Sequence, residues 1–456
     1  MHSNCIWQII LILAYQSYTN MFLQVIFLLI AAAAVTLFTM NVQKIIRNIH
    51  LGRSVNRSDR PSERLVTMLK VAFGQTKMVK RPVAAILHLF VYIGFVVINL
   101  EVLEIIIDGL FGTHRIFAGP MNGLYNVLIA SFEVLAALVL IGVIAFLIRR
   151  NLLKLKRFSG IEMTEWPKSD ANIILIVEVL LMTAFLTMNA ADFKLQQMGL
   201  THYINAGAFP VSSLIVPLLP DSESALVAIE RSCWWFHIIG IFAFLNYLPY
   251  SKHFHIILAF PNTYYSNLEP KGEFTDMASV TNEVKAMLDP SYTPEPAPEG
   301  GRFGAKDITD LTWKNLMDAY TCTECGRCTS VCPANITGKR LSPRKIMMDT
   351  RDRMEEVGKN IDKHGRDHND GKALLDDYIS REEIWACTTC NACTEACPVN
   401  IDPLAIIVEL RRFAVMEEAK APTSLNTMLS NVENNGAPWK YSPADRLNWA
   451  ENDLKI

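Results

Sequence analysis

The sequence has little charge. Only 19% of its 456 residues are Asp, Glu, Lys or Arg, below the roughly 25% of soluble domains, whereas 51% are apolar. This deficit excludes a disordered or collagen-like chain and indicates that part of the chain lies in lipid. Neither sign of charge dominates, since 43 Lys and Arg oppose 45 Asp and Glu, and the net charge of −2 argues against a nucleic-acid binder.

Cysteine is also scarce. Ten cysteines in 456 residues are too few for a small secreted disulfide scaffold. Eight of the ten fall between Cys322 and Cys397, and only Cys5 and Cys233 lie outside this stretch. Such clustering points to metal binding.

Uninterrupted apolar runs of bilayer length occupy the amino-terminal half of the chain, and none follows Phe260. Each run is apolar on all faces, so amphipathic surface helices and a soluble core are weaker interpretations. The sequence therefore predicts five membrane spans, at about residues 22–42, 83–107, 122–148, 171–190 and 232–260.

The loops between these spans differ in basic residues. The loop between the first two spans carries ten Lys and Arg and that between the third and fourth carries six, whereas residues 108–121 hold only Arg115, and residues 191–231 only Lys194 and Arg231. Because cytoplasmic loops collect Lys and Arg, everything after Phe260 is expected in the cytoplasm of a bacterial or archaeal cell, with the amino terminus outside.

Composition divides the chain into five regions. Residues 1–20 are set aside as an uncertain extension, because no basic residue precedes their short apolar run and Met21 is an alternative start. Helices are expected at 307–320, from Ser342-Pro343, and from Asp402-Pro403 to about 419. The predicted regions are the extension 1–20, a membrane domain 21–260, a Pro- and Gly-rich linker 261–306, a cysteine-rich domain 307–420 and a tail 421–456.

The cysteines form an internal repeat. Residues 322–336 read CTECGRCTSVCPANI and residues 387–401 read CTTCNACTEACPVNI, an offset of 65 residues. This is the C-x2-C-x2-C-x3-C-P spacing of bacterial ferredoxins, in which three cysteines of a run bind one [4Fe-4S] cluster and the fourth reaches the other cluster. The first predicted ligand set is Cys322, Cys325, Cys328 and Cys397, and the second is Cys387, Cys390, Cys393 and Cys332.

Structural zinc and disulfides are the alternatives for these cysteines. Zinc sites favour separated pairs of ligands over four cysteines in eleven residues. Disulfides are disfavoured in a reducing cytoplasm. Two [4Fe-4S] clusters in a helical ferredoxin-like domain are the favoured interpretation. The charged stretch 351–372 between the two runs is expected to be a solvated face.

Three histidines of the membrane half are candidate cofactor ligands. An ionisable residue inside a span is a functional candidate, although a single such histidine is about as often a satisfied structural one. His237 and His255 are 18 residues apart, which places both on one face if the fifth helix is continuous, whereas His253 points away. His88, at the cytoplasmic end of the second span, is expected at the depth of His255, and this pair is predicted to ligate one b-type haem.

A second haem lacks a matching partner. A ligand for a second haem, stacked beyond the first toward the other side of the membrane, would have to lie near position 98 or 99 of the second span. These residues are Ile98 and Asn99, and neither ligates haem iron. His237 is therefore expected to bind a haem through His114 or His202, or to hydrogen-bond a quinone, which is the preferred role. Gly94 and Gly240 are expected beside the haem.

These motifs resemble known proteins. The membrane half is similar to the five-span cytochrome b gamma subunit of respiratory nitrate reductase and to the membrane subunit of heterodisulfide reductase. The cysteine-rich half looks like the two-cluster iron–sulfur subunit of heterodisulfide reductase. Larger relatives carry adjacent cysteine pairs at a catalytic iron–sulfur site, and this chain has no such pair.

The resemblance implies an all-α electron-transfer subunit: a five-span bundle followed by a helical two-[4Fe-4S] domain. It would link a cytoplasmic redox subunit that carries the catalytic site, the clusters, b-type haem and menaquinone or ubiquinone. No catalytic residue of its own is identified. The alternatives are a membrane-anchored iron–sulfur redox sensor without haem, and a transporter that uses Glu133 and Glu178.

Overall fold

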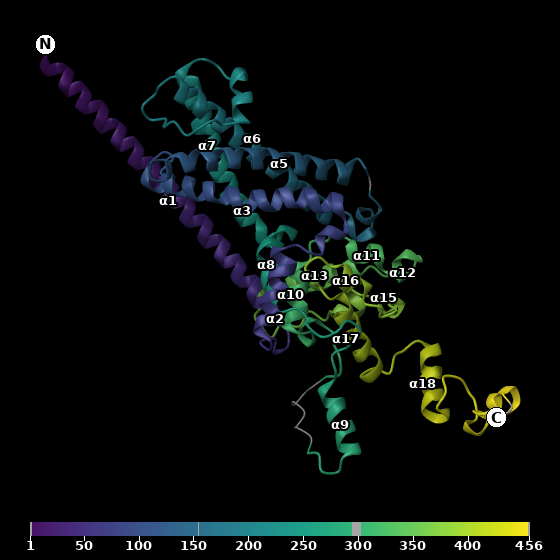
Figure 1. Ribbon diagram of the computed structural model, residues 1–456. Coiled ribbons are helices and arrows are strands. Elements are labelled where there is room, and N and C mark those ends of the chain that lie inside the picture. The colour runs from purple at the N-terminus through teal and green to yellow at the C-terminus, as the bar shows by residue number, and fades with distance from the viewer. Residues whose placement is uncertain (1, 154, 294–301, 455–456) are drawn as a thin grey trace.

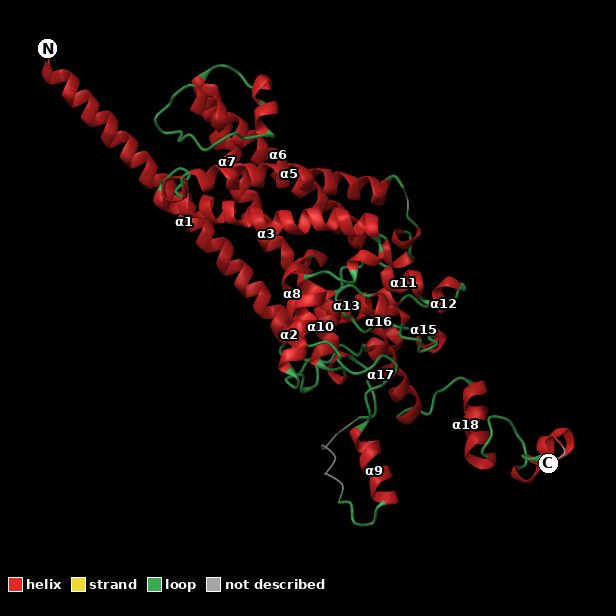
Figure 2. Cartoon of the chain, in the orientation of Figure 1, coloured by secondary structure: helices red, strands yellow, loops and turns green. Residues whose placement is uncertain are grey.

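A computed structural model describes residues 2–153, 155–293 and 302–454. Within these ranges the chain is helical, with two isolated bridges and no strand (Figure 2). The predicted all-α class is therefore confirmed. Residues 294–301 of the predicted linker lie outside the described residues.

Five helices are long and apolar enough to cross a membrane, as predicted. Their mean hydropathy ranges from 1.3 to 2.7 over the most apolar window of each helix. The five helices are α1 (His2–Ile49), α3 (Pro82–Phe111), α5 (Gly123–Asn151), α6 (Trp166–Gln197) and α7 (Glu223–Tyr247). They pack in chain order, with α3 along α5, α5 along α6 and α6 along α7, while α1 crosses α3 and α7 (Figure 1).

Two glycines allow close packing in this bundle. A Cβ atom on Gly94 would overlap Cγ2 of Val139, and one on Gly240 would lie 2.7 Å from Cδ2 of Leu181. Both glycines therefore face neighbouring helices. That they also flank a haem stays a prediction.

The fifth span begins and ends earlier than predicted, because it covers Glu223–Tyr250 and not residues 232–260. The α-helix α7 ends at Tyr247, a 3-10 turn continues to Tyr250, and α8 (His255–Tyr264) begins after a second 3-10 turn. Pro249 cannot donate a helical hydrogen bond. The buried carboxylate of Asp170 then stabilises the break, because it accepts hydrogen bonds from Ser251 Oγ at 2.7 Å and from the Lys252 amide at 3.2 Å.

The cysteine-rich domain is a set of short helices packed around one long one. The expected helix starts are present: Ser342 caps α13, and Asp402 accepts hydrogen bonds from two amides of α17. The helices of this domain are α10 (Trp313–Thr321), α11 (Arg327–Val331), α12 (Pro333–Ile336), α13 (Pro343–His364), α14 (Leu374–Asp377), α15 (Arg381–Ala386), α16 (Ala392–Ala396) and α17 (Pro403–Met416). Helix α9 (Ala278–Leu288) lies in the predicted linker and α18 (Thr423–Asn435) in the predicted tail.

The helix expected at 307–320 is divided. A 3-10 turn covers Ile308–Asp310, and α10 starts only at Trp313. Asp307 and Thr312 each form a capping box with the residue three positions later, so two helix starts compete within six residues. A single continuous helix is therefore wrong.

The charged stretch 351–372 is not simply a solvated face. Arg353, with 4% of its side chain exposed, forms ion pairs with Asp307 at 2.7 Å and with Asp370 at 2.6 Å. Arg351 pairs with the buried Glu324 at 2.7 Å. Arg351 thus ties α13 to the first cysteine run, and Arg353 ties it to the segments that carry Asp307 and Asp370.

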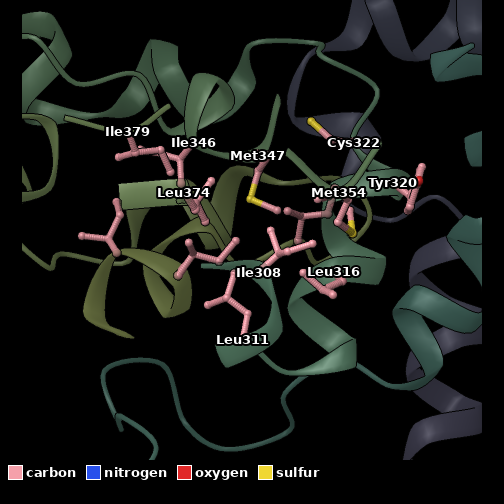
Figure 3. Packing of buried hydrophobic residues seen from close by; sticks show 14 of the residues in the cluster. Ile308, Leu311, Leu316, Tyr320, Cys322, Ile346, Met347, Met354, Leu374 and Ile379 are labelled. Carbon is pink, nitrogen blue, oxygen red and sulfur yellow. The ribbon is translucent and has the colours of Figure 1, made fainter. Parts of the chain in front are cut away.

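One continuous apolar core joins the two halves. It includes Ile45 and Ile49 at the end of α1, Leu258 of α8, and buried residues of the cysteine-rich domain. Figure 3 shows part of this core, with Ile308 and Leu316 among its labelled residues. At its margin Asn48 donates a hydrogen bond to the Tyr320 hydroxyl at 2.9 Å. The cysteine-rich domain is therefore packed onto the ends of the membrane helices.

Both basic loops contact this domain. After α1, Arg53 pairs with the backbone on either side of Thr312, and Trp313 Nε1 donates to the Val55 carbonyl at 2.9 Å. Between α5 and α6, Glu162 accepts hydrogen bonds from Ser342 Oγ at 2.6 Å and from Arg344 Nη2 at 2.7 Å. All Lys- and Arg-rich loops therefore lie on the side of the cysteines.

Replacing Arg344 by alanine should destabilise this attachment strongly. Its side chain is 1% exposed, that of Glu162 is 7% exposed, and Arg344 also donates to the Arg157 carbonyl at 2.6 Å. Removing one partner leaves a buried charge without its counter-charge, which typically costs about 3–5 kcal/mol. The apparent midpoint of thermal unfolding in detergent should fall clearly below that of the wild type.

Arg340→Ala is the matched control for Arg344→Ala. Arg340 is 76% exposed and lies 3.7 Å from a carboxylate oxygen of Glu382, which is itself 65% exposed. Exposed pairs of this kind contribute about 0–1 kcal/mol, so the midpoint should hardly move. Equal shifts for the two variants would show that the Arg344–Glu162 pair does not hold the loop.

Candidate functional site

The two cysteine runs have the same backbone conformation. Glu324 and Thr389, at equivalent places in the repeat, have φ values of 54° and 55°. Gly326 and Asn391, two residues later, have φ values of 69° and 59°. These left-handed residues turn the chain round the space between the cysteines, and such turns present backbone N–H groups to negatively charged groups.

Backbone amides also reach cysteine sulfurs. The Thr389 amide lies 3.4 Å from Sγ of Cys387, and the Ile401 amide lies 3.3 Å from Sγ of Cys397. Hydrogen bonds of this type stabilise thiolate ligands and tune the potential of an iron–sulfur cluster.

Cysteines of both runs line a common pocket. Three lining residues, Cys322, Cys325 and Cys328, come from the first run, and the fourth, Cys397, comes from the second. The structure thus brings together the four residues of the first predicted set. Helices α11 and α16, the helical turns of the two runs, pack against each other and allow this exchange.

The second predicted set also approaches across the repeat. Cys332 of the first run lies within electrostatic reach of Cys387 of the second run, as does Cys390. Cys393 interacts with Cys387 in the same way. Among the residues with described placement, no group of three His, Cys, Asp or Glu side chains lies close enough for a single metal ion.

The cysteines differ in access to solvent. Burial raises the pKa of the Cys322 thiol to about 11, and raises the pKa values of Cys393 and Cys397 to about 12. Iron binds the thiolate, so a cluster must displace these protons. Cys390 alone among the eight is exposed, which places the second set nearer to solvent than the first.

Residues 321–401 match the family model of the 4Fe-4S dicluster domain. The carboxy-terminal region carries a 4Fe-4S domain. The family-model match agrees with the repeat of eight cysteines and with the pocket they line, and it confirms the prediction of [4Fe-4S] binding.

Curated relatives are iron–sulfur oxidoreductases. The chain is 29% identical to the probable iron-sulfur-binding oxidoreductase FadF of Bacillus subtilis over 93% of its length and 60% of the relative. It is 28% identical to the EtfAB:quinone oxidoreductase of Syntrophomonas wolfei over 87% of its length and 55% of the relative. The chain thus spans a little over half of these two relatives. No solved structure matches.

The 4Fe-4S domain also has archaeal relatives. It is 36% identical to a subunit of the ferredoxin/F(420)H(2)-dependent CoB-CoM heterodisulfide reductase of Methanosarcina acetivorans, over 26% of this chain and 60% of the relative. The predicted likeness to heterodisulfide reductase subunits is therefore confirmed. Together with the five apolar helices, these findings describe a membrane-associated iron–sulfur protein with an electron-transfer role.

The histidines predicted as haem ligands lie beside the 4Fe-4S domain. His88 is on the second turn of α3 and His255 begins α8, and both His255 and Arg327 lie within electrostatic reach of His88. Arg327, between two cysteines of the first run, donates a hydrogen bond to the Lys77 carbonyl at 3.1 Å. The structure therefore places His88 within electrostatic reach of the first cysteine run, and His255 within electrostatic reach of His88.

Both rings are oriented by carbonyl oxygens. Nδ1 of His88 lies 3.1 Å from Oε1 of Gln75, and Nδ1 of His255 lies 3.0 Å from the Lys252 carbonyl. A carbonyl oxygen only accepts, so Nδ1 carries the proton and Nε2 keeps its lone pair. This hydrogen bond is the one that iron-ligating histidines usually make with their second nitrogen.

The structure gives a different reason for preferring His255 over His253 as a haem ligand. The argument from a continuous fifth helix is wrong, because the helix breaks at residues 248–254. The two rings lie close together, with centroids 5.6 Å apart, and burial lowers the pKa of both, for His253 to about 3. Both are neutral imidazoles, but among contacts between the described residues only His255 has its Nδ1 on a carbonyl oxygen.

Residues that the sequence analysis missed connect the cysteines to His255. Glu324, between Cys322 and Cys325, is 3% exposed and pairs with Lys252. The carbonyl of Lys252 in turn accepts the hydrogen bond from His255. The acidic Glu324 inside a cysteine run was a signal that the sequence offered. Nothing near Glu324 in the sequence indicated that Lys252 is its partner.

His237 lies apart from the other candidate histidines. It is 1% exposed in the middle of α7, and its Nδ1 lies 3.1 Å from the Leu181 carbonyl. His114 and His202 instead stack on each other at 5.1 Å, and His114 Nε2 lies 3.5 Å from Asp192. Leu181 and Asp192 are 11 residues apart on α6, roughly 16 Å, so His114 and His202 do not meet His237.

A buried polar network occupies the end of the bundle away from the 4Fe-4S domain. Arg115 bonds Asp192 at 2.6 Å and Asn189 at 2.9 Å. Glu133, a candidate in the transporter alternative, accepts hydrogen bonds from the amides of Val211 and Ser212 at 2.9 and 3.0 Å. Glu133 is thereby engaged in holding the loop between α6 and α7.

Proposed function

We propose that this chain passes electrons between a soluble redox partner and a membrane quinone through two [4Fe-4S] clusters and one b-type haem. The first cysteine set (Cys322, Cys325, Cys328 and Cys397) and the second cysteine set (Cys332, Cys387, Cys390 and Cys393) each hold one cluster. His88 and His255 ligate the haem. When bound, these centres carry single electrons and neither protons nor hydride.

The order of the sites carries this proposal. Cys390 of the second set is exposed to solvent, whereas Arg327 of the first run lies within electrostatic reach of His88. The candidate ligands thus follow one another from solvent to the membrane helices. A partner would meet the second set, and the first set would face the membrane.

The protein supplies fixed ligands and a dry environment. Carbonyl oxygens hold the two imidazoles in the tautomer that ligates iron, and Glu324 with Lys252 ties the first cysteine run to the backbone that orients His255. Burial of the thiols excludes water and, with amide hydrogen bonds, sets the potential.

The orientation follows from the basic loops. Both Lys- and Arg-rich loops contact the 4Fe-4S domain. Because basic loops stay inside the cell, the 4Fe-4S domain would face the cytoplasm. The printed name of the Syntrophomonas wolfei relative joins EtfAB to a quinone, which supports an EtfAB-like soluble partner. The catalytic site would then belong to that partner.

His237 is the proposed quinone contact. Its Nδ1 is held by the Leu181 carbonyl, so Nε2 is an acceptor and suits the hydroxyl of a quinol. Menaquinol and ubiquinol, the reduced forms of menaquinone and ubiquinone, share this group.

An anaerobic reoxidation experiment tests the function. The purified chain, reduced with dithionite and freed of excess reductant, should show b-type haem bands and iron–sulfur absorbance. Both signals should return to the oxidised form on addition of a soluble menaquinone or ubiquinone analogue, because electrons leave through the membrane half. Cys390→Ser is expected to slow reduction by a soluble partner more than reoxidation by quinone.

A redox sensor without haem is the competing function. It would use the same 4Fe-4S domain with the helices as an anchor. Absence of b-type bands, together with clusters that stay reduced after quinone addition, would exclude electron transfer to quinone and favour the sensor.

A further inference from the structure

A separate cavity lies where the membrane helices meet the 4Fe-4S domain. It has a volume of about 420 Å³ and opens between the first turn of α3, the end of α5, residues 155–157 and Ser330 of α11. No cysteine or histidine lines it. The cavity is therefore distinct from the proposed cluster and haem sites.

Cations surround this cavity. Its lining includes Arg81, Arg149, Lys156 and Arg157. None of these four pairs with a carboxylate among the residues of known placement. A thiolate at Cys325 favours the charge of Arg157, whereas the charges of Arg81, Arg149 and Arg327 oppose it. The acids of adjoining segments are engaged elsewhere, Glu162 with Arg344 and Glu395 with Lys80. An anion in the cavity would offset the remaining positive charge.

The amino terminus of α3 adds to the positive potential. Arg81 occupies the cap position without a side-chain hydrogen bond to the helix, and Pro82 has no N–H. The first helical hydrogen bond is that of the Ala85 amide to the Arg81 carbonyl at 2.9 Å. The amides of Val83 and Ala84, which line the cavity, thus have no helical acceptor, and the dipole of this 30-residue helix favours an anion there.

The cavity also has an apolar, lipid-facing side. Pro82, Val83 and Leu155 line it, and Val83 is 57% exposed. The adjoining Leu152 and Leu153 are 72% and 59% exposed. Because α3 begins and α5 ends here, the cations lie at the level of lipid headgroups and the apolar side chains lie toward the acyl chains.

We propose that this cavity binds the phosphate group of an anionic phospholipid in the leaflet next to the 4Fe-4S domain. Basic pockets between membrane helices are suited to such headgroups. The bound phosphate offsets part of the positive charge of the four cations and accepts hydrogen bonds from the free amides of α3. It also fixes the contact between Arg81 and Ser330 Oγ, 2.6 Å apart, which joins α3 to the helix that carries Cys328.

Lipid retention by the full chain tests this site. The protein is purified in neutral detergent, mixed with phosphatidylglycerol or phosphatidylcholine, and analysed by native mass spectrometry and thermal unfolding. The wild type should retain phosphatidylglycerol selectively. Arg149→Gln with Arg157→Gln should bind it roughly 30-fold more weakly, because each lost charge near the surface contributes about 1 kcal/mol.

Lys70→Gln with Lys168→Gln is the matched control. Both lysines are exposed on the same side of the bundle and do not line the cavity. This variant loses the same charge and should bind as the wild type does. If the arginine double variant does not fold, Lys156→Gln replaces it, since Lys156 is exposed, and a roughly fivefold loss is expected.

Two results would overturn the proposal. Equal losses in the cavity variants and the control would show a general surface attraction. Equal binding of phosphatidylglycerol and phosphatidylcholine, with inorganic phosphate alone raising the unfolding midpoint, would identify a free phosphate as the occupant. Neither outcome bears on the haem or the quinone, so this test is independent of the proposed function.

Discussion

Cys397→Ala is expected to remove one [4Fe-4S] cluster and to leave the other, although Cys397 lies in the second cysteine run. It lines the same pocket as the three cysteines of the first set. Iron and acid-labile sulfide in anaerobic preparations should each fall from about eight to about four per chain. Cys233→Ala, which alters a cysteine of α7 outside both runs, should retain the full content.

Double variants distinguish exchange of the fourth ligand from two independent runs. Cys397→Ala combined with Cys325→Ala affects one proposed set and should still retain about four irons. Cys397→Ala combined with Cys390→Ala affects both sets and should retain none. If each run bound its own cluster, the two results would be interchanged.

The cysteine site could be predicted because its information is local. Four cysteines, a proline and a repeat at an offset of 65 residues specify the two ligand sets without any long-range contact. The packing of α11 against α16 is compatible with the proposed exchange of fourth ligands. The five spans were also predictable, because length and hydropathy alone define them.

The details that depend on distant contacts could not be predicted. The fifth span ends early because Asp170 of α6 holds Ser251 and Lys252, about eighty positions away in sequence. The helix expected at 307–320 divides because two capping boxes compete. Arg353 was expected on a solvated face, because its partners Asp307 and Asp370 are distant in sequence and only the fold brings them to it.

The assignment of the haem-ligating histidines was in part predictable from the sequence and in part dependent on distant contacts. The choice of His255 rested on the phase of a continuous helix, which the structure does not contain. The choice of His88 rested on its depth in the membrane, and the structure does bring His88 within electrostatic reach of His255. The carbonyl contacts that now favour His255 come from Lys252, in a turn that no periodicity indicates.

His88→Ala and His255→Ala are each expected to abolish the b-type haem bands while iron–sulfur absorbance remains. Each variant removes one of two axial ligands, and the remaining imidazole cannot complete six-coordination. Optical spectra of the dithionite-reduced protein measure this loss. Reoxidation of the clusters by a quinone analogue should stop in the same variants, because the proposed connection from the first cysteine set into the membrane is lost.

His253→Ala is the control that makes this test specific. Its ring lies 5.6 Å from that of His255 and is equally sheltered, but no carbonyl oxygen fixes its Nδ1. The variant should keep a six-coordinate spectrum. A spectrum lost with His253→Ala and kept with His255→Ala would assign the axial ligand to His253. Normal haem bands in His88→Ala would remove α3 from the haem site altogether, because α3 carries no other histidine.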